Sequence, residues 1–248
     1  MVDLGCDWLG LRLANPFGVI CGTSAGAINA AALAAHCDRF EGAVDVIARV
    51  WENFSADQVY RADALGVVRT GARWLTMFSL GWLIARWRKV RPRSLLDNQP
   101  LAELLQRLVP LDRVRLMLAE RHLHALAVTA SSYTTGEHYT FYSSAETIPP
   151  WERSMRVAMP GPISHAHLLA SSAIPFVFPA ARLEHGGGGA WFGDGSMRQT
   201  APLSAAIHLG AQRLVIIGAG RMNEPQARRD AAIAAAAYPS MAQIAGHA

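Results

Sequence analysis

The spacing of apolar residues along the chain predicts short strands that alternate with helices. Helices are expected at residues 25–36, 41–60, 101–108, 111–120, 162–172 and 202–209. Apolar runs that favour strands occupy residues 17–21, 124–130, 138–143, 181–184, 190–192 and 213–217. Two hairpins are expected among them, one turning at Thr135 and Gly136 and one around the glycine loop 186–189. The alternation predicts an α/β layer fold with a mostly parallel central sheet.

The composition fits a folded domain with a sizeable core and excludes several kinds of protein. Of the 248 residues, 51% are hydrophobic and 17% are charged. The three cysteines form no Cys-x-x-Cys pair, so we expect neither a zinc site nor a disulfide framework, and a reducing compartment such as the cytoplasm fits best. The net charge of +4 is too small to identify a partner. No uncharged apolar run reaches the 18 residues or so that a membrane-spanning helix needs.

A Gly-x-Ser-x-Gly motif lies where the first apolar run meets the first expected helix. Its residues are Gly22, Thr23, Ser24, Ala25 and Gly26. A serine nucleophile needs a sharp strand-to-helix turn that exposes its hydroxyl, and we expect both glycines to remove Cβ atoms that would clash there. The free N–H groups of the following helix, with that of Ala25 first, can stabilise negative charge on an attacked carbonyl oxygen. An ordinary glycine-flanked turn is the alternative interpretation of the same five residues.

Asp194 is the candidate base for this serine. It lies between Gly193 and Gly195, directly after an aromatic strand, where the end of a strand can present a carboxylate at the edge of a sheet. An Asx-type turn is the alternative use of an aspartate beside glycine. None of the nine histidines lies in a motif that marks it as catalytic. The sequence therefore indicates a carboxylate as the partner of Ser24.

Three segments in a fixed order resemble the patatin-like phospholipase family. They are Gly-Thr-Ser-Ala-Gly-Ala-Ile-Asn-Ala-Ala from Gly22, Ala-Ser-Ser-Ala-Ile-Pro-Phe-Val-Phe-Pro from Ala170, and Phe-Gly-Asp-Gly from Phe192 with Pro-Leu from Pro202. The resemblance covers residues 15–220. It implies a three-layer α/β/α sandwich with a mostly parallel sheet, and hydrolysis of acyl esters in lipids. It also implies a Ser–Asp dyad, which maps to Ser24 and Asp194.

The sequence departs from the family pattern in two places. Family members carry a glycine-rich oxyanion loop on a strand well before the serine, whereas the 23 residues that precede Ser24 hold no cluster of glycines. We therefore expect a chain without that strand and loop, in which the Ala25 backbone is the oxyanion donor. Ser196 replaces the Gly or Ala that usually follows the Asp-Gly pair. The expected domains are a hydrolase domain over residues 1–220 and an incomplete helical tail over residues 221–248.

A tryptophan-rich and basic segment occupies residues 72–93. Its uncharged part, residues 74–85, is too short to span a membrane, and five basic residues follow within eight positions. Tryptophan beside clustered cations is typical of a lipid–water interface. The alternative is a lid helix packed on the core, and no recognition motif supports nucleic acid as a partner. The candidate interface residues are Trp74, Phe78, Trp82, Trp87, Arg88 and Lys89.

Three hypotheses about function follow from these observations. The first is a lipid acyl hydrolase that needs no metal or cofactor, is cytoplasmic, and binds peripherally to the inner face of the membrane. The second is a catalytically impaired, lipid-binding remnant of such an enzyme, which the missing glycine loop suggests. The third is an α/β-hydrolase with a Ser, acid and His in that order, which would use His208 or His247 after Asp194. The sequence predicts no particular oligomeric state.

Overall fold

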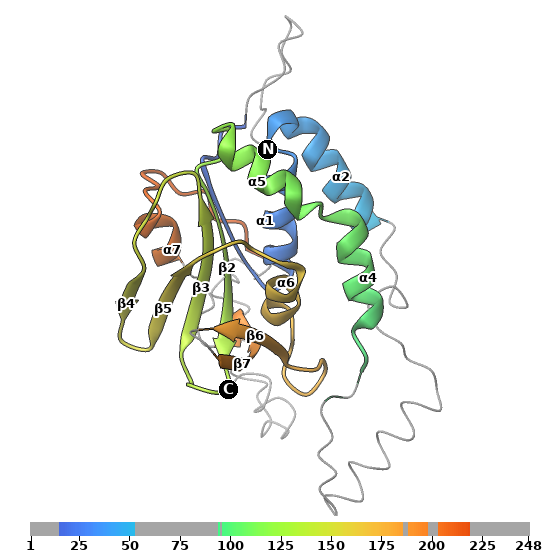
Figure 1. Cartoon of the computed structure of the whole chain (residues 1–248). Coiled ribbons are helices and arrows are strands. Elements are labelled where there is room, and N and C mark those ends of the chain that lie inside the picture. The colour runs from blue at the N-terminus through green and yellow to red at the C-terminus, as the bar shows by residue number, and fades with distance from the viewer. Residues whose placement is uncertain (1–14, 53–93, 95, 186–187, 198–202, 219–248) are drawn as a thin grey trace, which may run out of the picture. The chain divides into compact units, whose positions relative to one another are not determined.

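The computed structural model describes residues 15–52, 94, 96–185, 188–197 and 203–218 (Figure 1). The chain divides into two compact units, Met1–Gln212 and Arg213–Ala248. All of the described helices and strands lie in the first unit. The division therefore falls somewhat earlier than the boundary after residue 220 that the sequence predicts.

The described elements alternate between strands and helices, as the apolar pattern predicts. The strands are β1 (Val19–Thr23), β2 (Ala125–Ser132), β3 (His138–Ser144), β4 (Trp151–Arg153), β5 (Arg156–Pro160), β6 (Ala181–His185) and β7 (Gly188–Asp194). The helices are α1 (Ala25–Ala35), α2 (Phe40–Glu52), α4 (Gln99–Leu108), α5 (Leu111–Ala119), α6 (His165–Ser171) and α7 (Leu203–His208). Short 3₁₀ turns, η1 (Cys37–Arg39) and η3 (Gly195–Met197), follow α1 and β7.

The seven strands form one mixed sheet. Their order is β4-β5-β3-β2-β7-β6, and β1 pairs with β2 beside this path. The expectation of a mostly parallel sheet is not confirmed, because among the described strands β1–β2 and β3–β5 are parallel while β2–β3, β2–β7, β4–β5 and β6–β7 are antiparallel. The reason is local: β2–β3 and β6–β7 are hairpins, and a short turn joins antiparallel strands only.

One edge of β2 pairs with two strands in succession. β1 runs parallel to its first part, with Thr23 opposite Thr129, and β7 runs antiparallel to its last part, with Asp194 opposite Ala130. The other edge of β2 is occupied by β3. Because Thr129 and Ala130 are consecutive, the C-terminal ends of β1 and β7 meet head to head on the same edge. The residue that follows β1 is thereby brought next to the last residue of β7.

The two faces of the sheet belong to two apolar clusters. Leu126 and Val128 of β2 lie in the larger cluster with residues of α1, α4, α5 and α6, whereas Ala125 and Ala127 lie in the smaller one with Leu209. The alternation follows from the two-residue period of a strand. In Figure 1, α1, α2, α4, α5 and α6 cover one face of the sheet and α7 lies at the other. This arrangement confirms the α/β/α layering.

Alanine explains how closely α1 packs. Six alanines of the helix are buried: Ala27, Ala30, Ala31, Ala32, Ala34 and Ala35. Alanine is the best helix former and loses no side-chain entropy on burial. Its small side chain lets α1 approach β1, β2, α2, α5 and α6 at the same time. Because α1 is packed into the core, the position of its first residue, Ala25, is fixed as well.

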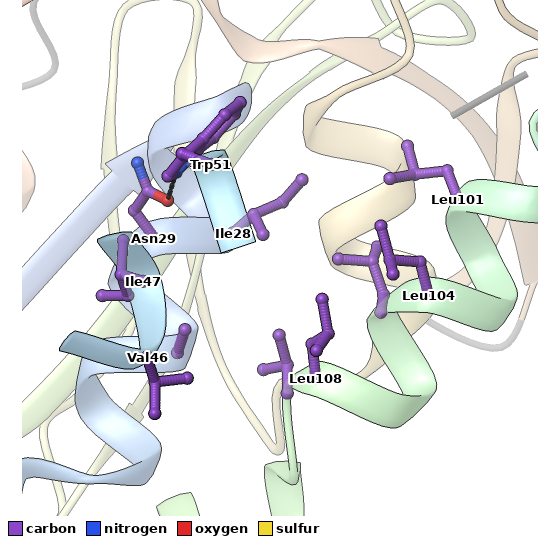
Figure 2. A pocket seen from close by; sticks show the side chains of 11 residues that line it. Ile28, Asn29, Val46, Ile47, Trp51, Leu101, Leu104 and Leu108 are labelled. Carbon is purple, nitrogen blue, oxygen red and sulfur yellow. Dashed lines mark hydrogen bonds between the residues drawn. The ribbon is translucent and has the colours of Figure 1, made fainter. Parts of the chain in front are cut away.

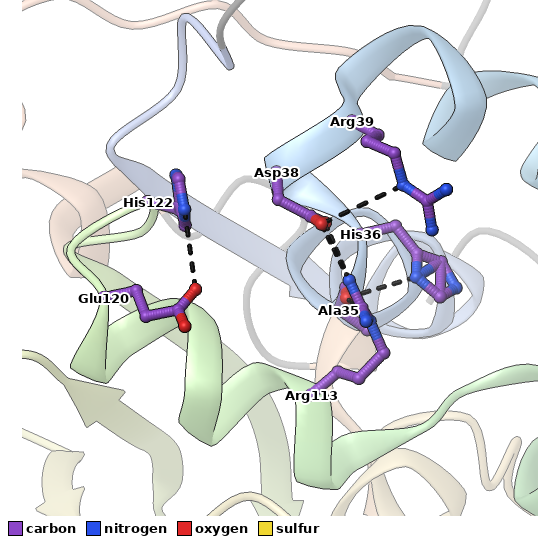
Figure 3. Close-up of polar contacts among 7 residues, drawn as sticks. All are labelled: Ala35, His36, Asp38, Arg39, Arg113, Glu120 and His122. Atoms are coloured by element: carbon purple, nitrogen blue, oxygen red, sulfur yellow. Dashed lines mark hydrogen bonds and ion pairs between the residues drawn. The ribbon is translucent and has the colours of Figure 1, made fainter.

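An arginine on α5 forms hydrogen bonds at the C-terminal end of α1 (Figure 3). Arg113 Nε donates to the Ala35 carbonyl at 2.9 Å, and Nη2 donates to the two carboxylate oxygens of Asp38 at 2.8 and 2.9 Å. Burial acts to raise the pKa of Asp38, but the hydrogen bond and the charge of Arg113 outweigh it and hold this pKa below its usual value. The Arg113–Asp38 pair therefore stabilises the fold fully at pH values above the usual pKa of an aspartate. Its contribution is lost as the pH falls through the lowered pKa of Asp38.

Some elements differ from those that the sequence predicts. Residues 213–217 were expected to form a strand, but residues 213–218 have no regular structure. A β-prone composition is not sufficient, because a strand also needs a neighbour to pair with. The apolar pattern predicts neither β4 nor β5. β4 in particular has only three residues, of which Glu152 and Arg153 are charged. The segment 72–93 and the helical tail 221–248 lie outside the described residues.

Candidate active site

Ser24 occupies the turn between β1 and α1. Its φ of 54° and ψ of −131° lie in a region that residues other than glycine rarely adopt. Such backbone strain costs of order 1–3 kcal/mol and persists only where the surroundings enforce it. The turn is the sharp strand-to-helix elbow that a Gly-x-Ser-x-Gly nucleophile requires. The sequence therefore places this serine correctly at the start of α1.

The two glycines of the motif have different roles. A Cβ on Gly22 would lie 2.2 Å from the Gly26 carbonyl oxygen and 2.6 Å from Ala27 Cα, so the backbone of α1 leaves no space for it. A Cβ on Gly26 would meet nothing within 4 Å. The expectation that both glycines prevent clashes is therefore right for Gly22 and wrong for Gly26. Gly26 lies in the exposed first turn of α1, where a side chain has free space.

Asp194 lies at the end of β7 and contacts the serine directly. Its side chain is buried, with the residue 2% exposed. Ser24 Oγ donates a hydrogen bond of 2.6 Å to Asp194 Oδ2, although the two residues are 170 positions apart. The adjacent hydroxyls of Thr23 and Thr129 also contact each other where the two strand ends meet. The structure thus brings together the two residues that the sequence singles out.

The second carboxylate oxygen of Asp194 has a different partner. The Ser196 backbone N–H donates to Asp194 Oδ1 at 2.8 Å, and the Ser196 hydroxyl donates to the same oxygen at 2.7 Å. The backbone bond is the Asx-type turn that was the alternative interpretation of this aspartate. Both interpretations of Asp194 are therefore compatible, because Oδ1 forms the turn while Oδ2 accepts from Ser24.

Two consecutive serines at the end of α6 hold the backbone of the nucleophile candidate. The Ser24 N–H donates to Ser171 Oγ at 2.9 Å, and Ser172 Oγ donates to the Ser24 carbonyl at 3.2 Å. Ser171 is fully buried. These contacts satisfy both backbone polar groups of a residue in a strained conformation. Sequence reasoning placed Ser171 and Ser172 in a family segment but gave them no role.

We expect Ser171→Ala to weaken catalysis more than substrate binding. The substitution leaves the partly buried Ser24 N–H without its acceptor, which costs on the order of 1 kcal/mol, and it releases the strained turn. If Ser24 is the nucleophile, its displacement by about 1 Å can cost 10²-fold in rate. We therefore expect kcat to fall by about 10- to 100-fold with KM within about threefold of the parent value. Steady-state kinetics on a short-chain ester would measure both constants, and an unchanged kcat would contradict this role.

The described histidines do not complete a triad. His208 stacks on Trp151 with ring centroids 4.8 Å apart, beside β4, and His247 lies outside the described residues. Burial, and to a lesser extent the charge of Arg156, lowers the pKa of His138 to about 4, and burial lowers that of His167 to about 4. In the described part of the chain, no hydrogen bond joins a histidine to Ser24 or Asp194.

The first turn of α1 offers the backbone donors that the motif predicts. Ala25 and Gly26 are exposed, and the first N–H groups of a helix have no acceptor within it. The Ser24 N–H is already used by Ser171. The Ala25 N–H therefore remains the predicted oxyanion donor. Residues 1–14, which belong to the segment before Ser24 that holds no cluster of glycines, lie outside the described part of the chain.

An apolar groove borders the same helix (Figure 2). Ile28 and Ala32 of α1, Ile47 of α2 and Leu101 and Leu105 of α4 are among the residues that line it. Trp51 Nε1 donates to Asn29 Oδ1 at 2.8 Å, so the indole N–H beside the groove has a hydrogen-bond partner. Ile28 follows Ser24 by four residues and so lies one helical turn away on α1. The groove offers hydrocarbon contacts along the helix that begins at the candidate nucleophile.

A mixed sheet between helical layers, with a serine at a strand-to-helix turn, is an arrangement of hydrolytic α/β enzymes. The chain belongs to the patatin-like phospholipase family, since residues 4–207 match the sequence model described as Patatin-like phospholipase. No curated protein matches the chain. Membership confirms the resemblance of the three ordered segments, and it supports a hydrolase that acts on lipid esters. Among the described residues, no helix is both long and apolar enough to cross a membrane.

Proposed function

We propose that this protein is a lipid acyl hydrolase that cleaves carboxylic esters through a Ser24–Asp194 dyad. The observation that carries the proposal is the 2.6 Å hydrogen bond from Ser24 Oγ to Asp194 Oδ2, made where the ends of β1 and β7 meet. Family membership supplies the substrate class. No histidine is needed, because the carboxylate itself lies within reach of the hydroxyl proton.

The first half of the reaction forms an acyl-enzyme. Ser24 Oγ attacks the ester carbonyl carbon while its proton passes to Asp194 Oδ2. The negative charge that develops on the carbonyl oxygen faces the N–H groups of the first turn of α1, of which the Ala25 N–H is the nearest in sequence. The tetrahedral intermediate then collapses. The C–O bond to the alcohol breaks, and the leaving oxygen takes the proton back from Asp194.

The second half releases the fatty acid. A water molecule attacks the acyl carbon and passes a proton to Asp194, and Ser24 leaves as the alkoxide and recovers that proton. Oδ1 keeps the Ser196 N–H as its donor through the cycle, whereas Oδ2 is the oxygen that takes up and returns the reacting protons. The two halves thus use the same pair of side chains in the same orientation.

Action at a membrane surface on the cytoplasmic side is part of this proposal. Its support is the sequence of residues 72–93, where tryptophans stand beside clustered arginines. Cations at this position would attract anionic lipid head groups, and tryptophan rings favour the depth of those head groups. A catalytically impaired protein that still binds lipid surfaces is the competing function.

Covalent labelling tests the proposal. The purified protein should react with a fluorophosphonate probe and hydrolyse a short-chain ester, because both need an activated serine. Ser24→Ala should lose the label and the turnover, whereas Ser154→Ala, which changes an exposed serine, should keep both. Label on the Ser24→Ala variant, or no label on the parent protein, would refute the dyad. Binding to anionic vesicles without label or turnover would favour the competing function.

A further inference from the structure

Two polar side chains on neighbouring strands are buried without hydrogen-bond partners. Ser131 and His138 are each 3% exposed. In the part of the chain that the structure describes, neither Ser131 Oγ nor either ring nitrogen of His138 forms a hydrogen bond. Most buried polar groups in proteins are paired, because an unpaired one has lost its bonds to water without replacement. His138 is therefore a buried titratable group that the proposed reaction does not use.

These two side chains belong to a row that crosses three strands. Ser131 of β2 is opposite His138 of β3, and His138 is opposite Arg156 of β5. Residues opposite each other on paired strands present their side chains on the same face of the sheet, so the imidazole stands between a hydroxyl and a cation. Ala130, the neighbour of Ser131, is opposite Asp194. The row thus adjoins the part of β2 that holds the candidate base.

The surroundings of His138 disfavour its protonated form. A protonated imidazole has two N–H donors and a positive charge, whereas the ring nitrogens have no acceptor among the described residues. Burial is the main cause that lowers the pKa of His138 from 6.5 to about 4, and the charge of Arg156 adds to it. Opening of the sheet would return the ring to water and to its ordinary pKa. The native form therefore binds this proton less readily than an open form does.

The described charged and titratable groups around the row are positive, neutral or already paired. β4 adds a second cation, Arg153, in register with β5. At the end of β2, burial and then the charge of Asp194 raise the pKa of Tyr133, so its hydroxyl stays neutral in acid. Asp194 already accepts through both carboxylate oxygens, and Glu137 accepts from Tyr139, whose ring packs in the larger cluster. The turn η3, which packs on β2, has no titratable side chain.

We propose that His138 makes the native β2–β3 pair a pH switch, because protonation of its ring favours opening of the sheet beside the candidate site. This switch belongs to the fold and acts whether or not Ser24 is a nucleophile. The stability that the neutral ring allows is fully present above pH 6.5 and is lost progressively as the pH falls toward 4. Between pH 7 and pH 5, the equilibrium should move about 20-fold toward the open form.

Unfolding by urea at pH 7 and at pH 5 tests this switch. The unfolding equilibrium constant at pH 5, divided by that at pH 7, should be about 20-fold smaller in His138→Phe than in the parent protein, since phenylalanine binds no proton. Other acid-sensitive groups are the same in both proteins and cancel. His122→Phe makes the same change at a side chain that is 48% exposed, and its ratio should stay within about twofold of the parent value. An unchanged ratio in His138→Phe would overturn the inference.

A second measurement leaves the ring in place. Histidine ring NMR on the parent protein, with the signal assigned through bonds from the His138 backbone amide, follows the protonation of this ring directly. The ring should remain mainly neutral in the folded protein at pH 5, because its pKa is about 4. A ring that is already protonated at pH 5, while circular dichroism shows an intact fold, would overturn the inference even if His138→Phe failed to fold.

Discussion

Replacing Asp194 by asparagine is expected to reduce kcat by about 10²–10⁴-fold, the usual contribution of a general base. The amide is nearly isosteric with the carboxylate, but it cannot take the proton of Ser24. Its nitrogen would also present hydrogens to the Ser24 hydroxyl or to the two donors of Ser196. Steady-state turnover of a short-chain ester measures the loss. The melting temperature, followed by circular dichroism, shows whether the fold persists.

A matched control is available on the surface. Asp112→Asn makes the same chemical change at a side chain that is 97% exposed and pairs only with the exposed Arg115, so turnover should stay at the parent value and the melting temperature should fall by no more than about 2–4 °C. Full turnover in Asp194→Asn would show that another group accepts the proton. In that case the 2.6 Å contact between Ser24 and Asp194 would have no role as an acid–base pair.

Gly22→Ala is expected to have the largest effect on stability of any substitution in the motif. The new Cβ would lie 2.2 Å from the Gly26 carbonyl oxygen and 2.6 Å from Ala27 Cα, and backbone atoms cannot rotate away as a side chain can. Relief requires β1 and α1 to move apart. Overpacking costs typically 1–3 kcal/mol, and we expect about 3 kcal/mol here, which lowers the melting temperature of a protein of this size by about 6–12 °C.

The second glycine of the motif is the control for this prediction. Gly26→Ala adds the same methyl group where it meets nothing within 4 Å, inside a helix that alanine favours. Its stability should be unchanged or higher by about 0.4–1 kcal/mol. Thermal unfolding of both variants by circular dichroism measures the difference. Equal destabilisation by the two substitutions would contradict the close contact at Gly22.

Local chemistry made much of the fold predictable. The glycine-bounded hairpins, the alanine-rich α1 and the elbow at Ser24 each follow from residues that are neighbours in sequence. The proportion of parallel pairing did not follow, because the hairpins impose antiparallel pairs and the distant strand β7 also meets β2 in the antiparallel direction. Residues 213–217 show the same limit, since their β-prone composition does not provide a partner strand.

The residues of the candidate site also separate into those that the sequence predicts and those that it does not. Ser24 and Asp194 could be found because their types and flanking glycines carry a chemical pattern. Ser171 carries no such pattern: a buried serine that accepts from a backbone N–H looks like any other serine in the sequence. Ser196 was visible as a departure from the family, but its contact with Asp194 Oδ1 is a fact of the turn geometry. Sequence reasoning therefore finds the candidate catalytic groups more readily than the groups that hold them in place.

The meeting of β1 and β7 on β2 also makes the proposed catalytic pair a reporter of folding. Ser24 and Asp194 are 170 residues apart, so their contact needs a long loop to close and both strands to dock on β2 in register. Contacts of such sequence separation form slowly and add to a high contact order. During refolding, competence for covalent labelling would arise only after the backbone of β2 has gained partners at Thr129 and at Ala130. A serine-directed probe could thus time the completion of the native topology.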